Sequence, residues 1–238
     1  MAVTTAVILA GGLGTRLRSV VSQVPKPMAP IEDRPFLERL MDYWIDQGIK
    51  RFILSVGYLS QAISGHFGNI YRTAEIDYAI EQERLGTGGG FLLATSKLRD
   101  EDAFLVLNGD TFFSVQLAEL DDFARRTDSH WALSLFRATE ANRYMGLALN
   151  EERRILSLAS QRGLAGGLAN GGVYWVRRSS LDNLPFEQGA AFSLEDEFLP
   201  VLLERGAPLF GFSANGTFID IGIPEDYKRA PQVLANIR

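Results

Sequence analysis

Short apolar runs alternate with longer amphipathic stretches through the first half of the chain. The runs of strand length are Ala6–Ala10, Arg51–Val56, Glu75–Ile80 and Ala103–Leu107, and the helical stretches are Pro35–Gln47, Ser60–Phe67 and Thr87–Ser96. This alternation predicts an α/β protein with a Rossmann-like, mostly parallel mixed sheet and helices on both faces. In such sheets ligands bind beyond the carboxyl ends of the strands, so we expect the functional site there.

The second half of the chain mixes strand-length runs with two amphipathic helical stretches. The strands are predicted at Trp131–Arg137, Met145–Leu149, Arg154–Leu158, Gly172–Val176 and Pro208–Ser213, and the helices at Leu194–Glu204 and Pro224–Leu234. The sequence contains no internal repeat, low-complexity segment or clear linker. We therefore expect a single domain over residues 1–238 with two lobes, one of about residues 1–130 and one of about residues 131–238.

Composition restricts the kind of protein further. With 238 residues, 46% of them hydrophobic, the chain can bury one sizeable core. The net charge of −5 argues against a nucleic-acid binder, and the lack of cysteine excludes disulfides and thiolate metal sites. No charged segment precedes the first apolar run, and no apolar stretch approaches ~18 residues. We expect a soluble cytoplasmic protein that does not contact the membrane.

The first predicted strand runs directly into a glycine-rich turn with positive charge. The turn carries Gly11, Gly12, Gly14, Thr15 and Arg16. Glycines after a strand let backbone N–H groups close on an anion, and the Arg16 guanidinium can bind phosphate oxygens through two donors. Lys26 follows between Pro25, whose φ is fixed, and Pro27, which pushes Lys26 to an extended conformation. The segment predicts a polyphosphate site, although a glycine turn beside a solvated proline-rich loop is the structural alternative.

This turn matches neither of two common phosphate-binding loops. The Walker A pattern does not occur here, and a dinucleotide fingerprint needs a small residue where this chain has Leu17. GGLGTRL followed by PKPM instead resembles the signature of the sugar-1-phosphate nucleotidyltransferases, which join a nucleoside triphosphate to a sugar phosphate. The resemblance extends from Val3 to about Tyr227. It implies the fold of nucleotide-diphospho-sugar transferases, with a nucleotide-binding first lobe and a sugar-binding second lobe.

Two aspartates follow short apolar strands and suit a metal ion. Asp110 ends AFLVLNGD, and Asp220 lies in TFIDIGIPEDY before Gly222. Carboxylates at neighbouring strand ends suit Mg²⁺, which binds few carboxylates and keeps substrate oxygens and waters. For Asp110, a turn that caps the strand exit is the alternative. In the resembled family, one aspartate after the central strand and one in a late D-x-G element hold the metal, which implies that Asp110 and Asp220 bind Mg²⁺.

The segment YAIEQERLGTGGGF resembles the family's turn beside the nucleobase. The resemblance assigns nucleotide contacts to Leu9, Gly86, Thr87 and Gly88 as well as to the glycine turn. Glu81 corresponds to the family's base-reading position. Because a carboxylate accepts hydrogen bonds and guanine offers adjacent N–H donors, Glu81 favours GTP over other triphosphates. A solvated charge at the end of a strand is the alternative for Glu81.

The family resemblance also assigns residues to the sugar-phosphate side of the site. The family has a glutamate–lysine pair before its N-x-G-[IV]-Y strand, and this chain has Gln161 and Arg162 there. Arg162 keeps the charge and can bind phosphate bidentately, but an ordinary loop arginine is the alternative. The resemblance also assigns sugar contacts to Gly146, Asn170, Gly171 and Glu195.

Within the family, four local strings most resemble the D-glycero-α-D-manno-heptose 1-phosphate guanylyltransferases. These are ERLGTGGG, LANGGVYWV, FSLEDEFLP and FIDIGIPEDY. The resemblance implies transfer of GMP from GTP to the heptose 1-phosphate, giving GDP-heptose and pyrophosphate for capsule or lipopolysaccharide synthesis. Arg16, Lys26 and Asp110 are the predicted catalytic residues. Mannose 1-phosphate as the acceptor, or uridylyl or thymidylyl transfer, is the alternative.

Two other functional classes share a nucleotide-binding parallel sheet. Glycosyltransferases that consume nucleotide-sugars use an Asp-x-Asp metal motif, which NGDT lacks. A non-catalytic sensor of nucleotide-sugars has no need to retain Arg16, Lys26, Asp110 and Asp220 together. Both classes are therefore less favoured. Small relatives are often dimers or tetramers, so the resemblance leaves a homo-oligomer open.

Overall fold

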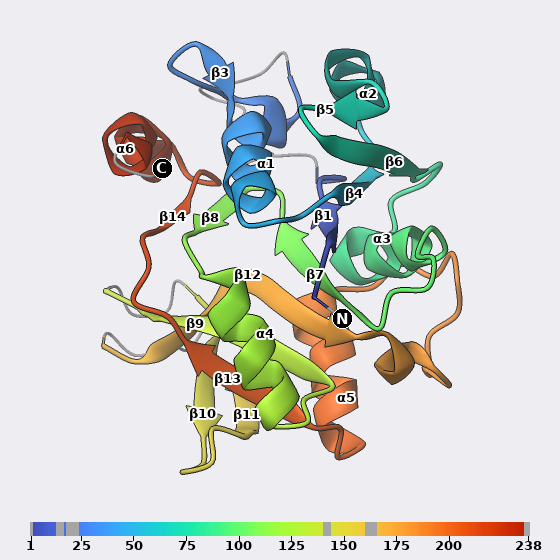
Figure 1. Cartoon of the computed structure of the whole chain (residues 1–238), viewed down its shortest axis with the longest axis vertical. Helices are drawn as coiled ribbons and strands as arrows, with labels where there is room; N and C mark the ends of the chain where they lie inside the picture. Colours follow the sequence, from blue (N-terminus) through green and yellow to red (C-terminus); the bar gives the residue numbers. More distant parts are fainter. Residues whose placement is uncertain (1, 13–16, 18–23, 140–143, 160–165, 236–238) are drawn as a thin grey trace.

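The architecture is organised around one mixed sheet, which has ten strands in the part of the chain that the structure describes. The computed structural model describes residues 2–12, 17, 24–139, 144–159 and 166–235 (Figure 1). The central strands are parallel, in the order β7 (Ala103–Asn108), β1 (Thr5–Leu9), β4 (Arg51–Val56) and β6 (Ala74–Ile80). A two-residue strand, β5 (Ile70–Tyr71), pairs antiparallel with β6. These strands match the alternation predicted for the first half.

The second half extends the sheet mainly with antiparallel strands. They are β9 (Trp131–Arg137), β10 (Gly146–Leu149), β11 (Ile155–Ala159), β12 (Leu168–Arg177) and β13 (Leu209–Ser213). β12 pairs antiparallel with β7, β9 and β10, while β13 runs parallel to β9. One sheet thus passes through both predicted lobes, and the lobe boundary near residue 130 stays a prediction. The predicted fold class, a mixed sheet with a parallel centre, is confirmed.

Helices cover both faces because successive strand residues point to opposite sides. In β1, Ile8 belongs to the hydrophobic core that includes α1, and Val7 to the core that includes α3. The helices are α1 (Phe36–Asp46), α2 (Ser60–Phe67), α3 (Gly86–Thr95), α4 (Leu117–Arg126), α5 (Leu199–Glu204) and α6 (Pro224–Leu234), and Leu194–Phe198 forms a π-helical turn, η4. None of the described helices has the length and apolar composition that a membrane span requires.

A small separate sheet joins two distant parts of the chain. β8 (Thr111–Phe113) pairs antiparallel with β14 (Phe218–Asp220), and Asp220 lies opposite Thr111. The backbone N–H of Ile221 also donates to the Asp110 carbonyl at 3.0 Å. Figure 1 shows α6 directly after β14, so the end of the chain lies beside this sheet. The pairing brings the two predicted metal-binding aspartates together.

The prediction did not include α4 or several very short strands, among them β5 and β8. α4 is a charged helix whose buried side chains, Leu117, Leu120 and Ala124, form a narrow stripe at helical spacing. β8 and β14 have three residues each, too few to show an alternating pattern, and they form because each is the other's partner.

Candidate active site

A cavity of about 430 Å³ opens where the parallel strands β1 and β7 end. Its lining brings together predicted residues from several elements, namely Leu9, Gly11, Gly12, Lys26, Glu81, Gly86, Thr87 and Asp110. Four other predicted residues, Gly14, Thr15, Arg16 and Arg162, lie outside the described residues. Residues from the amino end and the middle of the chain thus meet at the carboxyl edge of the sheet, as the fold class leads one to expect.

Lys26 lies between the two predicted metal-binding aspartates. The prediction of an extended Lys26 is wrong: Pro25 is extended, but Lys26 begins a short 3₁₀ turn, η2 (Lys26–Met28), because the Ala29 N–H donates to the Lys26 carbonyl at 3.0 Å. The Lys26 ammonium contacts Asp110 Oδ2, and its Nζ is 3.9 Å from Asp220 Oδ1. The Lys26 side chain is only 9% exposed, so water screens these charges weakly. One cation and two acids from opposite ends of the sequence therefore converge on one point.

The space at Gly222 explains how the three groups fit together. A Cβ atom at this position would lie 2.3 Å from Lys26 Nζ and 2.6 Å from Asp220 Oδ1. The Gly222 N–H donates to the same Asp220 oxygen at 2.6 Å, which orients the carboxylate. The D-x-G pattern is thus a steric requirement of the site.

The acidic pair has the chemistry of a Mg²⁺ site. Mg²⁺ is commonly bound by one or two carboxylates, with waters and substrate phosphates completing its shell. Asp110 and Asp220 provide two such carboxylates, which both approach the Lys26 ammonium. Asn108, two residues before Asp110, adds a buried Oδ1 that has no hydrogen-bond partner within the described structure. The residues present therefore fit Mg²⁺. The supporting observation is that the carboxylates of Asp110 and Asp220 both lie near one cation, the Lys26 ammonium.

Glu81 is held at the cavity wall by two donors. The backbone N–H of Leu85 donates to Oε2 at 3.2 Å, and Ser55 Oγ donates to Oε1 at 3.3 Å. Its carboxylate fills the space beside two glycines: a Cβ on Gly11 would lie 2.2 Å from Oε1, and one on Gly90 would lie 2.7 Å from it. Gly11 therefore leaves space for the Glu81 carboxylate as well as for a bound phosphate. The sequence did not indicate the first of these two roles.

The LGTGG turn has two sides with different roles. Gly86 and Thr87 line the cavity, whereas Gly88 is buried behind it and donates its backbone N–H to the Phe192 carbonyl at 2.9 Å. A Cβ on Gly88 would lie 2.2 Å from the Phe192 ring. The turn thus lets the segment before η4 pack closely, and this packing carries Glu195 to the site.

Glu195 lies in a polar network built from four elements. Thr87 Oγ1 donates to Oε2 at 2.9 Å, while the Tyr174 hydroxyl and Asn108 Nδ2 approach Oε1 at 3.3 and 3.4 Å. Asn170 Nδ2 donates to the Tyr174 hydroxyl at 2.7 Å. Burial raises the pKa of Glu195 above its ordinary value and raises the pKa of Tyr174 well above 10. An uncharged ligand with hydroxyl donors suits such a carboxylate.

Two predicted sugar-binding glycines do not line this cavity. Gly146 is buried at the start of β10, where it pairs with Ala169. Gly171 packs against the Phe113 ring, which a Cβ atom would approach to 2.4 Å. Gly171 thus lets β12 pack closely on Phe113, and Gly146 pairs in the sheet with the residue that precedes Asn170.

Three polar residues that line the cavity were assigned no role from the sequence, namely Ser55, Arg84 and Asn108. Arg84 is exposed and makes no hydrogen bond or ion pair with any described residue, although it lies three residues after Glu81. Arg84 could have been identified from the sequence, because it places a positive charge in the segment predicted to contact the nucleobase. Asn108 directly precedes the Gly-Asp turn, but its role depends on Glu195, which is distant in sequence.

The sequence pattern of the nucleotidyl transferase family matches residues 5–236. The chain belongs to the nucleotidyl transferase family. This nucleotidyltransferase is 40% identical to the D-glycero-alpha-D-manno-heptose 1-phosphate guanylyltransferase of Aneurinibacillus thermoaerophilus, with 96% of this chain and 97% of that protein covered. It is 38% identical to the enzyme of the same name from Campylobacter jejuni subsp. jejuni serotype O:2, over 93% of this chain and 96% of that protein.

The fold of this chain is also similar to that of a solved structure. HddC from Yersinia pseudotuberculosis complexed with GMP-PN superimposes with a TM-score of 0.83 and is 35% identical, covering 96% of this chain and 98% of HddC. The predicted family and enzyme class are thereby confirmed. The roles of individual site residues remain proposals that rest on the geometry above.

Gly11→Ala in the nucleotidyltransferase is expected to raise the KM for the triphosphate roughly 10-fold, because the new methyl group must displace the Glu81 carboxylate at a cost of about 1–3 kcal/mol. Steady-state kinetics checks this. Gly65→Ala, in α2 with open space around the added methyl group, is the matched control and should leave KM unchanged. A wild-type KM for Gly11→Ala would show that Glu81 does not need this space.

Proposed function

We propose that this nucleotidyltransferase transfers GMP from GTP to D-glycero-α-D-manno-heptose 1-phosphate, giving GDP-heptose and pyrophosphate. The observation that carries the proposal is the convergence of Lys26 with Asp110 and Asp220 at a cavity that also holds Glu81. The similarity to two heptose 1-phosphate guanylyltransferases supports the guanine nucleotide and the heptose, and the GMP-PN complex of HddC also supports the guanine nucleotide.

The reaction needs no nucleophile from the protein. An oxygen of the sugar 1-phosphate attacks the α-phosphorus of GTP, a new P–O bond forms, and the bond to the β-phosphate breaks with release of pyrophosphate. Both substrates are anions, so their repulsion must be overcome by positioning and by cations. Lys26 is proposed to neutralise oxygens at the α-phosphorus, and the Gly11 and Gly12 backbone to border the phosphates.

Asp110 and Asp220 would hold Mg²⁺, which when bound neutralises phosphate charge. Arg16 and Arg162, outside the described residues, keep the roles that the family resemblance implies: Arg16 binds the leaving phosphates, and Arg162 binds the sugar phosphate. Arg84 adds a cation without a described partner at the same cavity, suited to the nucleotide. Because GTP and sugar phosphates are cytoplasmic metabolites, we place the reaction in the cytoplasm, where it would supply surface-polysaccharide synthesis.

Glu81→Gln is expected to lower kcat/KM for GTP roughly 10–100-fold. The carboxylate, oriented by Leu85 N–H and Ser55, can accept both the N1–H and N2–H₂ donors of guanine. An amide offers one acceptor, and a paired contact of this kind is worth about 1–3 kcal/mol. The measurement is kcat/KM for GTP, UTP, dTTP and CTP in both proteins. The preference for GTP should shrink in Glu81→Gln, and an unchanged preference would exclude Glu81 from base reading.

Glu195 is proposed to accept hydrogen bonds from sugar hydroxyls. Because burial raises its pKa, the folded protein disfavours the ionised form. The resulting loss of folding stability is absent at a pH below the unfolded-state pKa of Glu195. It grows as the pH rises toward the raised folded-state pKa, and it reaches its full size above that value. Glu195→Gln should therefore raise the Tm at pH 8, and the gain should disappear as the pH falls through this window.

Kinetics separates this stability effect from the role in sugar binding. Glu195→Gln should raise the KM for the sugar 1-phosphate roughly 10-fold, since a hydrogen bond to a charged group is worth about 1.5–3 kcal/mol. The KM for GTP should not change. An equal rise in both KM values would show that Glu195 shapes the whole site rather than binding the sugar.

Pyrophosphate release from a matrix of triphosphates and sugar 1-phosphates tests the proposed function. The expected result is turnover with GTP and the heptose 1-phosphate. Mannose 1-phosphate lacks one exocyclic CHOH, which alone is worth a small difference in binding, so it is the second candidate acceptor. Exclusive use of UTP or dTTP would overturn the guanine assignment, and equal use of mannose 1-phosphate would overturn the heptose assignment.

A further inference from the structure

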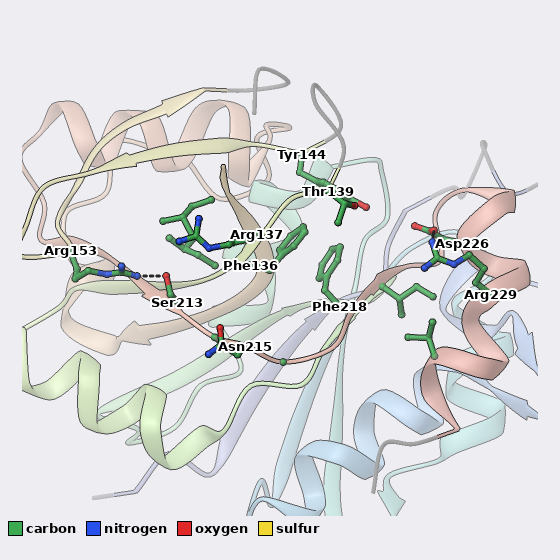
Figure 2. A pocket seen from close by; sticks show the side chains of 16 residues that line it. Phe136, Arg137, Thr139, Tyr144, Arg153, Ser213, Asn215, Phe218, Asp226 and Arg229 are labelled. Carbon is green, nitrogen blue, oxygen red and sulfur yellow. Dashed lines mark hydrogen bonds and ion pairs between the residues drawn. The ribbon is translucent and has the colours of Figure 1, made fainter. Parts of the chain in front are cut away.

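A second cavity, of about 540 Å³, lies among β9, β13, β14 and α6 (Figure 2). It shares no lining residue with the active-site cavity in the described structure. Its walls come from the ends of β9 and β13, from β14 and from α6. It lies within the 300–1,000 Å³ range typical of small-molecule sites.

The lining of this cavity is cationic in an acidic protein. Its charged residues are Arg137, Arg153, Arg229 and Asp226. Arg229 pairs with Asp226 at 3.2 Å. Neither Arg137 nor Arg153 has a carboxylate partner among the described residues, whereas the whole chain has a net charge of −5. The two guanidinium groups therefore concentrate positive charge at one end of the cavity.

The contacts of these two arginines leave donors available. Arg137 is exposed and donates to the Gly166 carbonyl at 3.1 Å. Arg153 donates to the Gly211 carbonyl at 3.1 Å and to Ser213 Oγ. Each guanidinium has five N–H groups, so most donors of Arg137 and several of Arg153 are not used by described residues. Figure 2 shows both side chains at the end of the cavity where Ser213 lies.

The other part of the cavity offers aromatic rings. Phe136 and Phe218 stack with their centroids 3.9 Å apart, and Tyr144 stands edge-on to Phe218 at 5.4 Å. All three line the cavity, and Figure 2 shows them between the arginine end and α6. Guanidinium donors beside an aromatic wall suit a molecule that joins a phosphate to a ring.

We propose that this cavity is a second ligand site for a phosphorylated, ring-bearing small molecule, either a nucleoside diphosphate or a sugar phosphate. Arg137 and Arg153 bind its phosphate oxygens, and the aromatic wall contacts its ring. Phe218 lies two residues before Asp220 on β14, so a ligand here contacts the strand that carries an active-site carboxylate. The proposal does not depend on which nucleotide or sugar the active site uses.

A structural role for the arginines predicts a different outcome. Arg153 has a positive φ of 71° and connects the β10–β11 turn to β13 through its contacts with Gly211 and Ser213. If Arg153 served only to hold this turn, its loss would lower the Tm without changing ligand binding. The test therefore measures binding stoichiometry and stability in the same variants.

Isothermal titration calorimetry of the full chain, with GDP and with mannose 1-phosphate as probes, tests the site. We expect at least one probe to occupy a second site per chain. Arg137→Gln/Arg153→Gln should weaken that site roughly 10-fold or more, as expected for lost charged hydrogen bonds, and leave the active site unaffected. Arg126→Gln, an exposed arginine paired with Asp122 on α4, is the matched control and should retain both sites.

Three results would overturn the proposal. The first is that the wild-type chain has a single binding site for each probe. The second is that both sites bind as in the wild type in the Arg137→Gln/Arg153→Gln variant. The third is that Glu81→Gln abolishes binding at the second site. The last result would mean that the extra binding belongs to the active site. Should the double variant unfold, Arg137→Gln alone decides, since this exposed side chain contacts one backbone carbonyl in the described structure. Because Glu81→Gln acts on the active site, failure of the proposed function is distinguishable from failure of this site.

Discussion

Lys26→Ala is expected to lower kcat roughly 10²–10³-fold while the protein remains folded, because removal of one preorganised group that stabilises transition-state charge costs about 3–4 kcal/mol. The ammonium lies beside Asp110 and 3.9 Å from Asp220, at the cavity proposed to hold the triphosphate. Removing it leaves two carboxylates facing each other without their described cation. The variant should therefore also show a lower Tm in the absence of Mg²⁺.

Pyrophosphate release at saturating GTP and sugar phosphate measures the loss, and thermal unfolding with and without Mg²⁺ measures the effect on the acidic pair. Mg²⁺ should recover more stability in Lys26→Ala than in the wild type, because it can take over the neutralisation of both carboxylates. Lys50→Ala, an exposed lysine directly before β4 at the opposite end of the sheet, is the control and should leave kcat unchanged. Wild-type turnover by Lys26→Ala would remove this residue from the mechanism.

Asp110→Asn is expected to lower kcat/KM roughly 10³-fold with little change in fold, since a bound metal contributes several kcal/mol of charge stabilisation. The amide keeps the shape of the side chain and can still accept from Lys26, but it loses the negative charge that suits Mg²⁺. The measurement is pyrophosphate release over a range of Mg²⁺ concentrations. The Mg²⁺ concentration for half-maximal rate should rise in the variant.

A second readout for Asp110→Asn does not depend on turnover. The Tm increase that Mg²⁺ produces in the wild type should shrink or disappear in Asp110→Asn. Asp100→Asn, an exposed aspartate before β7 at the other end of the sheet, provides the charge-matched control and should respond to Mg²⁺ like the wild type. An unchanged Mg²⁺ dependence in Asp110→Asn would place the ion elsewhere.

Most helices and strands of five residues or more were predictable from the sequence, but α4 was not, although its buried residues recur at helical spacing. The helix at Ser60–Phe67 and the one at Pro224–Leu234 agree with the prediction at both ends. β12, by contrast, runs over Leu168–Arg177 and is longer than predicted, because Asn170 and the glycines after it break its apolar pattern. β14 has three residues and depends on β8 as its partner. Local pattern carries no information about such a distant pairing.

In the site, too, residues that belong to local motifs were predictable, whereas residues whose role depends on distant segments were not. Lys26, Asp110 and Glu81 were identified from motifs, and all three line one cavity. Asn108 was missed because its significance comes from Glu195, which the packing of Gly88 against Phe192 brings near. The second cavity was missed for the same reason, since Arg137 and Arg153 belong to no motif and gather where β9 and the β10–β11 turn meet.

The sequence by itself determined the family and the α/β class, and it predicted which residue types would form the main site. Glycine turns, a proline-flanked lysine and strand-end aspartates are local patterns, and their physical requirements act within a few residues. Tertiary structure decided which of these groups meet. The β8–β14 pairing sets Asp220 near Asp110, the space at Gly222 admits Lys26 between them, and strand ends far apart in sequence form a positively charged second cavity. Such encounters depend on packing between distant segments, which no local pattern specifies.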